Sequence, residues 1–537
     1  MNKNSIIYTT EIEKFYYSPI VNLGYGIHSN DDFLNLYVFI GRSTDFGENV
    51  VEAPEINLTP TKTKTILKNI IALKKANLND ISPIIERIDW TANTFYYSYD
   101  SSINFGLKGA DNKLLKPFYV RNKYDQVFKC LWNNLTSYDS YSISEIANNS
   151  THYTITHEGG TFDVGSLVTI DTVDPSEYNG TFRIVSSAVG TANVICAYQE
   201  QYAMSANNYS SGGRIKTAIL STEEPILSTG NFNSENIVKT TDGYKWKYLY
   251  TIDKGGKLKF FDNSWMPVPV SSVTKYPYYS GIGWGSIDVV NIVNGGNGYT
   301  NGTNTVSILV DGDGYGFSAE AFVSNNVIQD ITVLDKGYDY TYANITTTPA
   351  LSYSGSGAEI VWSVSPIGGH KFDLLQELYC KDISVSVPFE QELFSKSFYF
   401  SQVGILYNPY VKTDTENHSN STFISCTTDI IVTSLGNPFI NGELVYQGNS
   451  LEDYTFKANV LSFDTANNYL TLINTYGTPA ENFEIFGVES NAVKIVQQSI
   501  PSSYVPNSGN LFYVENRLEE LRDNVGSQQI RLMINYN

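Results

Sequence analysis

The alternation of hydrophobic and polar residues is most regular in Thr240–Ile252, where it predicts a β-strand with one aromatic face. The Asp242-Gly243 pair is a turn signal, because glycine accepts a positive φ without a Cβ clash. After this turn the pattern has a period of two residues, and one side carries Tyr244, Trp246, Tyr248, Tyr250 and Ile252. This face has to be covered, either by the aromatic stretch Pro117–Asn133 in a common core or by a partner at an interface.

A buried strand and an amphipathic helix are predicted in the first 75 residues. Phe33–Ser43 is almost continuously apolar and predicts the strand. Thr59-Pro60 then supplies an N-cap and a first-turn proline, and apolar residues follow at helical spacing as far as Leu73. We interpret the lysines around them as a solvated helix face rather than as a contact for an acidic partner.

A second helix is predicted over Asn122–Asn134, because its larger apolar residues recur every three or four positions. We expect Tyr124 and Phe128 of this helix to pack around Trp246 of the aromatic strand.

Two regions predict small β modules inserted into larger domains. Between Tyr138 and about Lys216, short alternating runs are separated by turn residues, and the flanks are rich in Asn and Ser, as linkers are. Residues 428–500 show the same pattern within the C-terminal region. Around that second module we expect a short helix at Phe372–Tyr379 and a strand at Phe398–Tyr407. The final strands, Leu511–Glu515 and Gln529–Tyr536, enclose a polar segment that suits a helix.

Residues 287–364 contain an internal repeat with an offset of 41 residues. Ile287–Thr300 aligns with Ile328–Thr341, and the glycines at 314 and 316 align with those at 355 and 357. Each copy is predicted to be strand, Gly-Tyr-Thr turn, strand, Gly-rich turn and strand. Two copies predict a compact pseudo-symmetric β unit and are too few for a long solenoid.

These patterns predict a mainly β, elongated, multidomain protein built of sandwich-like and barrel-like modules. The predicted domains are an α+β parent domain (1–137 with 217–275), an inserted β module (138–216), a Gly-rich domain with the repeat (276–366), and a C-terminal β domain (367–537) with a barrel-like module at about 428–500.

Composition agrees with this picture and disfavours some functions. The chain has 40 Tyr, 27 Phe and 40 Gly, which favours strands over helices. Its net charge of −20 disfavours unaided binding to nucleic acid. The N-terminus resembles no signal peptide, and no apolar run is long enough to span a membrane, so we expect a chain that is made in the cytosol. The dispersed Cys130, Cys196, Cys380 and Cys426 are interpreted as buried free thiols.

The sequence offers little catalytic chemistry, and we predict no catalytic, cofactor-binding or metal-binding residues. The five histidines (His28, His152, His157, His370 and His418) have no metal-ligand spacing, and His152 and His157 are interpreted as surface polar residues. The acidic pair Asp311 and Asp313 lies in a Gly-rich turn without the later ligands of a calcium loop. A glycosidase needs two carboxyl groups at a defined distance from each other, and the sequence alone cannot show whether two of the Asp or Glu side chains lie at that distance.

Six blocks of sequence, in order along the chain, resemble one family. They are Phe39-Ile40-Gly41-Arg42-Ser43, Phe118–Leu131, Thr241–Tyr250, Pro366-Ile367-Gly368-Gly369-His370, Gly404–Pro409 and Gly509–Arg522. As an ordered set they resemble the baseplate wedge subunit of contractile-tailed, T-even-type bacteriophages, the gene-product-eight type. The chain departs from that family in the Gly-Tyr-Thr repeat, and in Leu518-Glu519-Glu520-Leu521 where a proline-containing segment is expected.

The resemblance implies a late, non-enzymatic virion protein of the tail baseplate, assembled in the host cytoplasm. It implies a homodimer that contacts other wedge proteins and helps to couple host recognition to sheath contraction. Nucleic acid, membrane insertion and a small-molecule substrate are not expected. Two alternatives stay open: a receptor- or glycan-binding tail protein, and a tail-associated glycan hydrolase.

Overall fold

A computed structural model gives the fold of the protein. It describes residues 5–7, 35–44, 46–47, 51–56, 59–101, 103–109, 112–134, 140–148, 151–196, 208–228, 236–269, 285–303, 305–350, 353–390, 396–523 and 526–535. Strands make up 52% of the structure and helices 5%, which confirms a mainly β protein with several sheets and small barrels. No helix within these ranges is long and apolar enough to cross a bilayer.

The chain forms two compact units, which differ from the predicted domains. Residues 1–83 join residues 381–537 in the first unit, and residues 84–380 form the second. The predicted parent domain had instead joined residues 1–137 to 217–275. The physical reason is a ladder between strands far apart in sequence: β2 (Leu36–Gly41) pairs with β24 (Phe398–Tyr407) over its full length. Local patterns carry no information about such a pairing.

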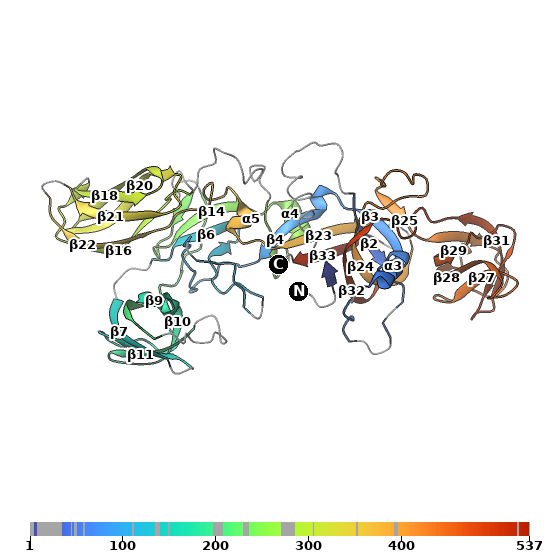
Figure 1. The fold of residues 1–537 in the computed structure, drawn as a ribbon, viewed down its shortest axis with the longest axis horizontal. Helices are drawn as coiled ribbons and strands as arrows, with labels where there is room; N and C mark the ends of the chain where they lie inside the picture. The colour runs from blue at the N-terminus through green and yellow to red at the C-terminus, as the bar shows by residue number, and fades with distance from the viewer. Residues whose placement is uncertain are drawn as a thin grey trace. The chain divides into compact units, whose positions relative to one another are not determined.

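The first unit is built on a six-stranded sheet with the order β1-β32-β24-β2-β3-β25 (Figure 1). The remaining strands of this sheet are β1 (Ser5–Ile7), β3 (Ile70–Lys75), β25 (Phe423–Ser425) and β32 (Asn510–Arg522). Helix α3 (Pro60–Lys68) begins at the N-cap Thr59, as predicted, and its buried Ile66 and Leu67 pack in the core of this sheet. A second antiparallel pair in this unit joins β23 (Asp382–Phe389) to β33 (Gln528–Asn535).

The first unit also contains a closed six-stranded barrel, at the position of the predicted C-terminal module. Its strands are β26 (Thr428–Val432), β27 (Leu444–Gly448), β28 (Tyr454–Asp464), β29 (Tyr469–Tyr476), β30 (Glu484–Gly487) and β31 (Val493–Ile500). The first and last strands pair, with Asp429 opposite Ile500. The chain therefore enters and leaves this barrel at neighbouring points.

The second unit is organised around the aromatic sheet, whose strand order is β13-β14-β6-β5 (Figure 1). The strands are β5 (Tyr119–Arg121), β6 (Gln126–Trp132), β13 (Ile237–Lys239) and β14 (Lys245–Thr251). Trp246 is 0% exposed and packs with Tyr96, Phe128 and Tyr244, so this aromatic face belongs to a core. Beyond β14, Asp253 caps helix α4 (Lys254–Phe260), and β15 (Trp265–Pro267) pairs with β4 (Ile81–Glu86) at residues 84–86.

A second closed barrel lies between β6 and β13 in the sequence, where an inserted module is predicted. It consists of β7 (Ser140–Asn148), β8 (Tyr153–His157), β9 (Leu167–Asp174), β10 (Gly180–Ala188), β11 (Thr191–Cys196) and β12 (Ser211–Thr217). Here too the first and last strands pair, with Ser140 opposite Lys216. Because its two ends are adjacent, the barrel interrupts the parent sheet at a single place.

Each copy of the repeat contains the three predicted strands, and the first copy also has a two-residue strand, β17 (Gly302–Thr303). The first copy contains β16 (Val290–Asn297), β18 (Val306–Gly312) and β19 (Tyr315–Ser324), and the second contains β20 (Val327–Tyr338), β21 (Ala343–Pro349) and β22 (Ser356–Trp362). The ladders run β16–β22, β18–β21 and β19–β20, so each of these strands pairs with the other copy. The repeated tyrosines, Tyr299 and Tyr340, are buried in the shared core.

The repeated glycines explain why this turn pattern occurs twice. A Cβ on Gly314 would overlap the ring of Tyr340, and a Cβ on Gly355 would overlap the ring of Tyr299. We expect Gly314→Ala to lower the free energy of unfolding by about 1–3 kcal/mol, because the buried ring has to move. Thermal unfolding followed by circular dichroism measures this. Gly255→Ala, at an exposed position of α4, is the control and should cost little, since alanine favours a helix and its Cβ would meet only the Asp253 carboxylate oxygen, at 3.1 Å.

Three secondary-structure predictions are wrong. Asn122–Asn134 contains strand β6 instead of a helix, and Tyr124, predicted to be inside, is 57% exposed. The first helix stops at Lys68, and strand β3 takes up the remaining apolar residues. The polar segment after Glu515 continues strand β32 rather than forming a helix. The short helix near residue 374 is confirmed as α5 (Leu374–Glu377).

Candidate functional site

Most of the residues that were considered as candidate metal ligands or catalytic groups in the sequence have a structural role in the fold. In the parts of the chain that the structure describes, no group of three or more His, Cys, Asp or Glu side chains is placed to hold a metal ion. Asp313 accepts hydrogen bonds from the backbone N–H groups of Thr341 (2.9 Å) and Tyr342 (3.2 Å). The Asp313 carboxylate therefore stabilises a turn of the repeat, which agrees with the interpretation of this segment as a Gly-rich turn.

The histidines are dispersed, and one prediction about them is wrong. His157 is not a surface residue: it is buried in the inserted barrel, stacks on Tyr141, and accepts a hydrogen bond from the Gly159 N–H at its Nδ1. His418 lies against Tyr410 in the first unit. His28 lies outside the described residues.

The cysteines partly follow the prediction of buried free thiols. Cys130, Cys380 and Cys426 form no disulfide; the first two are buried, and Cys426 is half-buried. Burial raises the pKa of the Cys130 thiol well above its usual value, so it is not a reactive thiolate. The side chain of Cys196 lies outside the described part of the chain.

The most unusual electrostatic feature is a buried charged junction in the second unit, formed by Lys129, Lys247, Asp288, His370 and Glu377. Lys129 of β6 lies 3.0 Å from Glu377 of α5, and both side chains are at most 1% exposed. Lys247 of β14 lies 3.0 Å from Asp288, on the segment that leads into the repeat. His370 Nδ1 lies 2.5 Å from Glu377 Oε1.

Neighbouring groups complete the junction. The Lys129 ammonium lies 3.3 Å from the centre of the Tyr99 ring, a cation–π contact inside the protein. Ser286 Oγ donates to Asp288, and the Ser286 N–H donates to Ser365 Oγ at 2.8 Å. The junction thus connects the aromatic sheet, helix α5 and both ends of the repeat module within one unit.

The junction holds its charges in a defined state. Burial would raise the pKa of the Glu377 carboxyl, but Lys129, His370 and the Lys371 backbone N–H outweigh burial and hold that pKa well below its usual range. The pKa of His370 is lowered, because burial and the Lys129 ammonium disfavour the imidazolium more than Glu377 favours it. At neutral pH the junction therefore contains a carboxylate at Glu377 and a neutral imidazole at His370.

This arrangement predicts a pH dependence of stability. Because the pKa of His370 is below its ordinary value of 6.5, the unfolded chain binds the proton more readily than the folded chain does. The free energy of unfolding should therefore fall as the pH drops through this value, and fall further near pH 4, where Asp288 and Glu377 act with the same sign. Urea midpoints at pH 7.5, 6 and 5 measure this. His370→Asn should flatten the first part of the profile, and equal profiles for both proteins would contradict the assignment.

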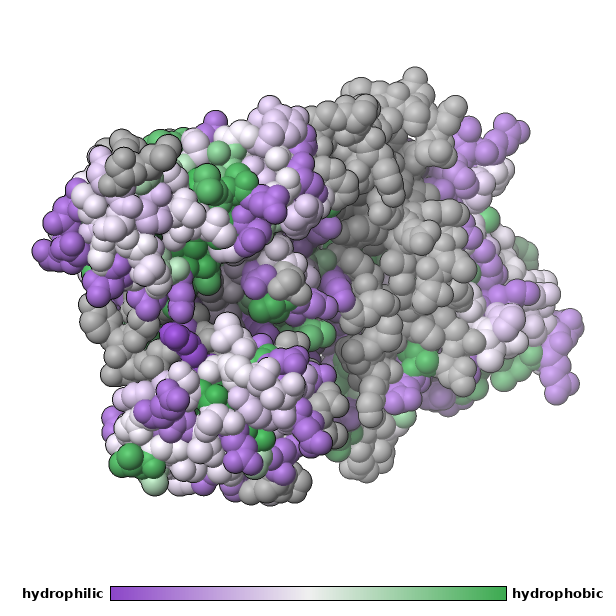
Figure 2. Space-filling view, turned by 60° about the vertical axis from the view of Figure 1, so that its left-hand side comes forward, coloured by the Kyte–Doolittle hydropathy of each residue, from purple (hydrophilic) through white to green (hydrophobic). Residues whose placement is uncertain are grey.

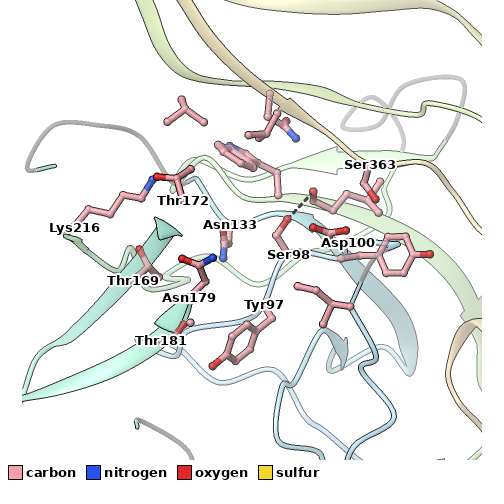
Figure 3. Close-up of a pocket in the computed structure, with 18 of the residues that line it drawn as sticks. Tyr97, Ser98, Asp100, Asn133, Thr169, Thr172, Asn179, Thr181, Lys216 and Ser363 are labelled. Carbon is pink, nitrogen blue, oxygen red and sulfur yellow. Dashed lines mark hydrogen bonds between the residues drawn. The ribbon is translucent and has the colours of Figure 1, made fainter. Parts of the chain in front are cut away.

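A cleft in the second unit is the other candidate site. It has a volume of about 790 Å³ and lies between the outer face of the inserted barrel, the residues that follow β6, and strands β16 and β22 (Figure 3). Figure 2 shows the surface hollowed between the barrel and the repeat module, with hydrophobic residues along the edge. Thr169, Thr181 and Lys216 form a row of neighbours on the barrel wall, and all three are buried.

Three residues that line this cleft carry enclosed polar atoms with no hydrogen-bond partner among the described residues. They are Asn133 Oδ1, Thr169 Oγ1 and Asn291 Oδ1, on residues that are 2%, 6% and 3% exposed. A buried polar atom without a partner costs roughly 1–3 kcal/mol and requires an explanation.

Neither site was predicted as a site from the sequence, although part of the junction carried a signal. Lys129 stands inside the apolar run Val127–Trp132, and a lysine in such a run needs a buried partner. The partner, Glu377, is 248 residues away, and no local pattern identifies it. The cleft residues Asn133, Thr169 and Asn291 come from three separate modules and have no common motif.

No model of a protein family matches the sequence, and no curated protein matches it significantly.

Proposed function

We propose that this chain is a structural protein of a contractile phage tail, a component of the baseplate wedge that acts as a homodimeric scaffold between neighbouring wedge proteins. In that role it would help to transmit host recognition to sheath contraction. The proposal starts from the six blocks that resemble the gene-product-eight type of wedge subunit. It includes no enzymatic step.

The placement of the six blocks is the observation that supports the proposal best. Three of them supply β2, β24 and β32, which are consecutive neighbours in the sheet of the first unit. Two others supply β5, β6 and β14, which are consecutive neighbours in the aromatic sheet. The remaining block ends at His370 in the charged junction. Blocks that are far apart in sequence thus form one continuous framework in each unit, as expected if they are inherited together.

The barrels and the repeat lie outside these blocks, which suits a scaffold. Each barrel begins and ends on paired strands, so it can present its outer surface to a neighbour without interrupting the framework at a second place. The outer face of the C-terminal barrel carries exposed apolar side chains, among them Phe483, Val493 and Ile495. Exposed apolar side chains of this kind are common at protein–protein interfaces.

The mass of the purified protein, measured by light scattering, tests the proposal. Alone, the chain should be a stable dimer, and mixed with the tail-baseplate proteins encoded beside it, it should shift into a larger complex of defined mass. A variant with residues 430–499 replaced by a short Gly-Ser link is the matched comparison, because Asp429 and Ile500 are already neighbours. If the chain is instead a monomer or trimer that does not bind those proteins but does bind host cells, the alternative of a receptor-binding tail protein is favoured.

A further inference from the structure

We propose that the outer face of the C-terminal barrel binds a neighbouring protein whose contact surface has an apolar centre surrounded by lysine or arginine side chains. This inference rests on the proposed scaffold role and names the chemistry of one partner surface. It concerns a row of side chains, called the aromatic band, that crosses strands β27 to β31 of this barrel (Figure 1). The members of the aromatic band are Tyr446, Lys457, Tyr476, Phe486 and Val493.

The strand register makes the aromatic band continuous. Val493 of β31 pairs with Phe486 of β30, and Phe486 also pairs with Tyr446 of β27. Tyr446 pairs in turn with Lys457 of β28, and Lys457 pairs with Tyr476 of β29. The rings of Tyr446 and Phe486 stack with their centres 5.3 Å apart. Five neighbouring strands therefore contribute to one row of contacting side chains.

The aromatic band lies on the outside of the barrel. Val445 and Ile485, which each precede a member of the row, are buried in the barrel core, so the members themselves point outward. Tyr476 is 62% exposed and Val493 is 45% exposed. Ile495, two residues further along β31, adds a side chain that is 43% exposed. The outer face of this barrel is therefore both apolar and accessible.

The inserted barrel shows that a six-stranded barrel of this kind does not need an apolar outer face. Both barrels close by pairing their first strand with their last. On the inserted barrel an outer row consists of Thr154, Asn193 and Ser186, which are joined by hydrogen bonds of 2.8 and 2.7 Å. The aromatic band is thus not a requirement of the barrel fold, and exposed apolar faces of this kind mark contact sites.

The charges around the aromatic band indicate a basic partner. Residues 428–500 contain eight Asp or Glu residues and two Lys residues. The exposed acids are Glu452, Asp453, Asp464, Glu481, Glu484 and Glu489. Of the two lysines, Lys494 is only 3% exposed. Glu484 borders the band directly, because it pairs with Ile495 in the same ladder that joins Phe486 to Val493.

This charge distribution selects between two possible occupants of the face. A second copy of the barrel would place carboxylates against carboxylates, and like charges across an interface are unfavourable. A different protein with lysine or arginine around an apolar centre would form ion pairs at the rim and bury the aromatic band beneath it.

A cation already lies on an aromatic ring next to the band. The Lys457 ammonium lies 4.4 Å from the centre of the Tyr454 ring. Tyr454 meets Tyr476 edge to face, with ring centres 5.5 Å apart. A lysine or arginine of the partner can take the corresponding position over the exposed Tyr476 ring. A neutral saccharide carries no cation for such a contact.

Calorimetric titration of the full-length chain with the purified tail-baseplate proteins encoded beside it, one protein at a time, tests the inference. At least one of them should bind. The double variant Val493→Thr/Ile495→Thr should weaken that binding by about ten-fold or more, because polar side chains replace the apolar centre. Glu484→Lys should weaken it as well, and so should added salt, because both reduce the attraction for a basic partner.

The matched controls lie on the inserted barrel. Val185→Thr changes a valine that is 44% exposed, and Glu145→Lys reverses an exposed carboxylate. Both control variants should bind the partner as the unchanged chain does. Thermal melting shows whether each variant is folded. If the double variant does not fold, Tyr476→Ser, at a side chain that is 62% exposed, repeats the test on another strand.

Different outcomes overturn the inference and the proposed function. If a neighbouring protein binds the unchanged chain and the variants of the aromatic band equally well, the inference is wrong and the scaffold role stands. The inference is also wrong if Glu484→Lys binds more tightly, since the partner surface is then acidic. It is wrong again if the band variants convert a dimer into a monomer, since a second copy then covers the face. If none of the neighbouring proteins binds, the proposed function fails together with the inference.

Discussion

Replacing Glu377 with alanine should lower the free energy of unfolding by about 3–5 kcal/mol. The substitution leaves the Lys129 ammonium without its carboxylate partner, 3.0 Å away, at a position where both side chains are almost completely buried. It also removes the acceptor for His370 and for the Lys371 N–H. Urea unfolding followed by circular dichroism at pH 7.5 gives the free-energy difference directly.

Two control variants show whether the loss of stability comes from an unpaired buried charge. The double variant Lys129→Met/Glu377→Leu should recover most of the lost stability, because an apolar pair of similar volume leaves no unpaired charge. Lys123→Met, which breaks the ion pair between the exposed Lys123 and the half-buried Glu224, should shift the midpoint far less than Glu377→Ala does. If Glu377→Ala unfolds at the same midpoint as the unchanged chain, the junction is not a paired, desolvated site.

Replacing Trp246 with alanine should cost roughly 3–5 kcal/mol and yield insoluble protein. The indole is 0% exposed, lies in edge contact with Tyr96 at 5.5 Å, and stacks on Tyr244. Alanine would leave a cavity at the centre of the aromatic sheet. Unfolding in urea measures the cost, after refolding where the protein is insoluble.

Two further substitutions show whether the cost of Trp246→Ala comes from the cavity or from loss of the indole N–H. The indole N–H has no hydrogen-bond partner among the described residues, so Trp246→Phe loses volume but no hydrogen bond and should cost clearly less than alanine. Leu258→Ala, at a side chain in the same unit that is 87% exposed, should have almost no effect. A soluble, normally melting Trp246→Ala protein would show that the aromatic face is not a core.

Sequence reasoning succeeded where a strand has one buried face or a repeated turn. It failed at β6 and β3, because both strands are buried on both faces and therefore lack alternation. Across the turn before β6 and the strand itself, Tyr124, Phe128 and Leu131 have helical spacing by coincidence. Lys247 shows the same limit: alternation placed it opposite the aromatic face, yet it is buried and paired with Asp288.

Neither candidate site could be assembled from local patterns. Lys129 and Glu377 meet only because β6 and α5 pack together, and the cleft exists only because a barrel, a sheet end and a repeat converge in one unit. The pattern of hydrophobic and polar residues, together with the turn-forming residues, predicts which strands and helices form. The long-range pairing that brings Asn133, Thr169 and Asn291 together depends on the tertiary fold as a whole.

The reciprocal pairing of the two repeat copies means that neither copy is complete without the other. Because β16, β18 and β19 each pair with a strand of the second copy, half of the module has no complete sheet of its own. A chain with a single copy could complete these ladders only by associating with a second molecule. The module therefore has the strand pairing of a symmetric dimer within a single chain, and joining the two halves makes their association intramolecular and independent of protein concentration.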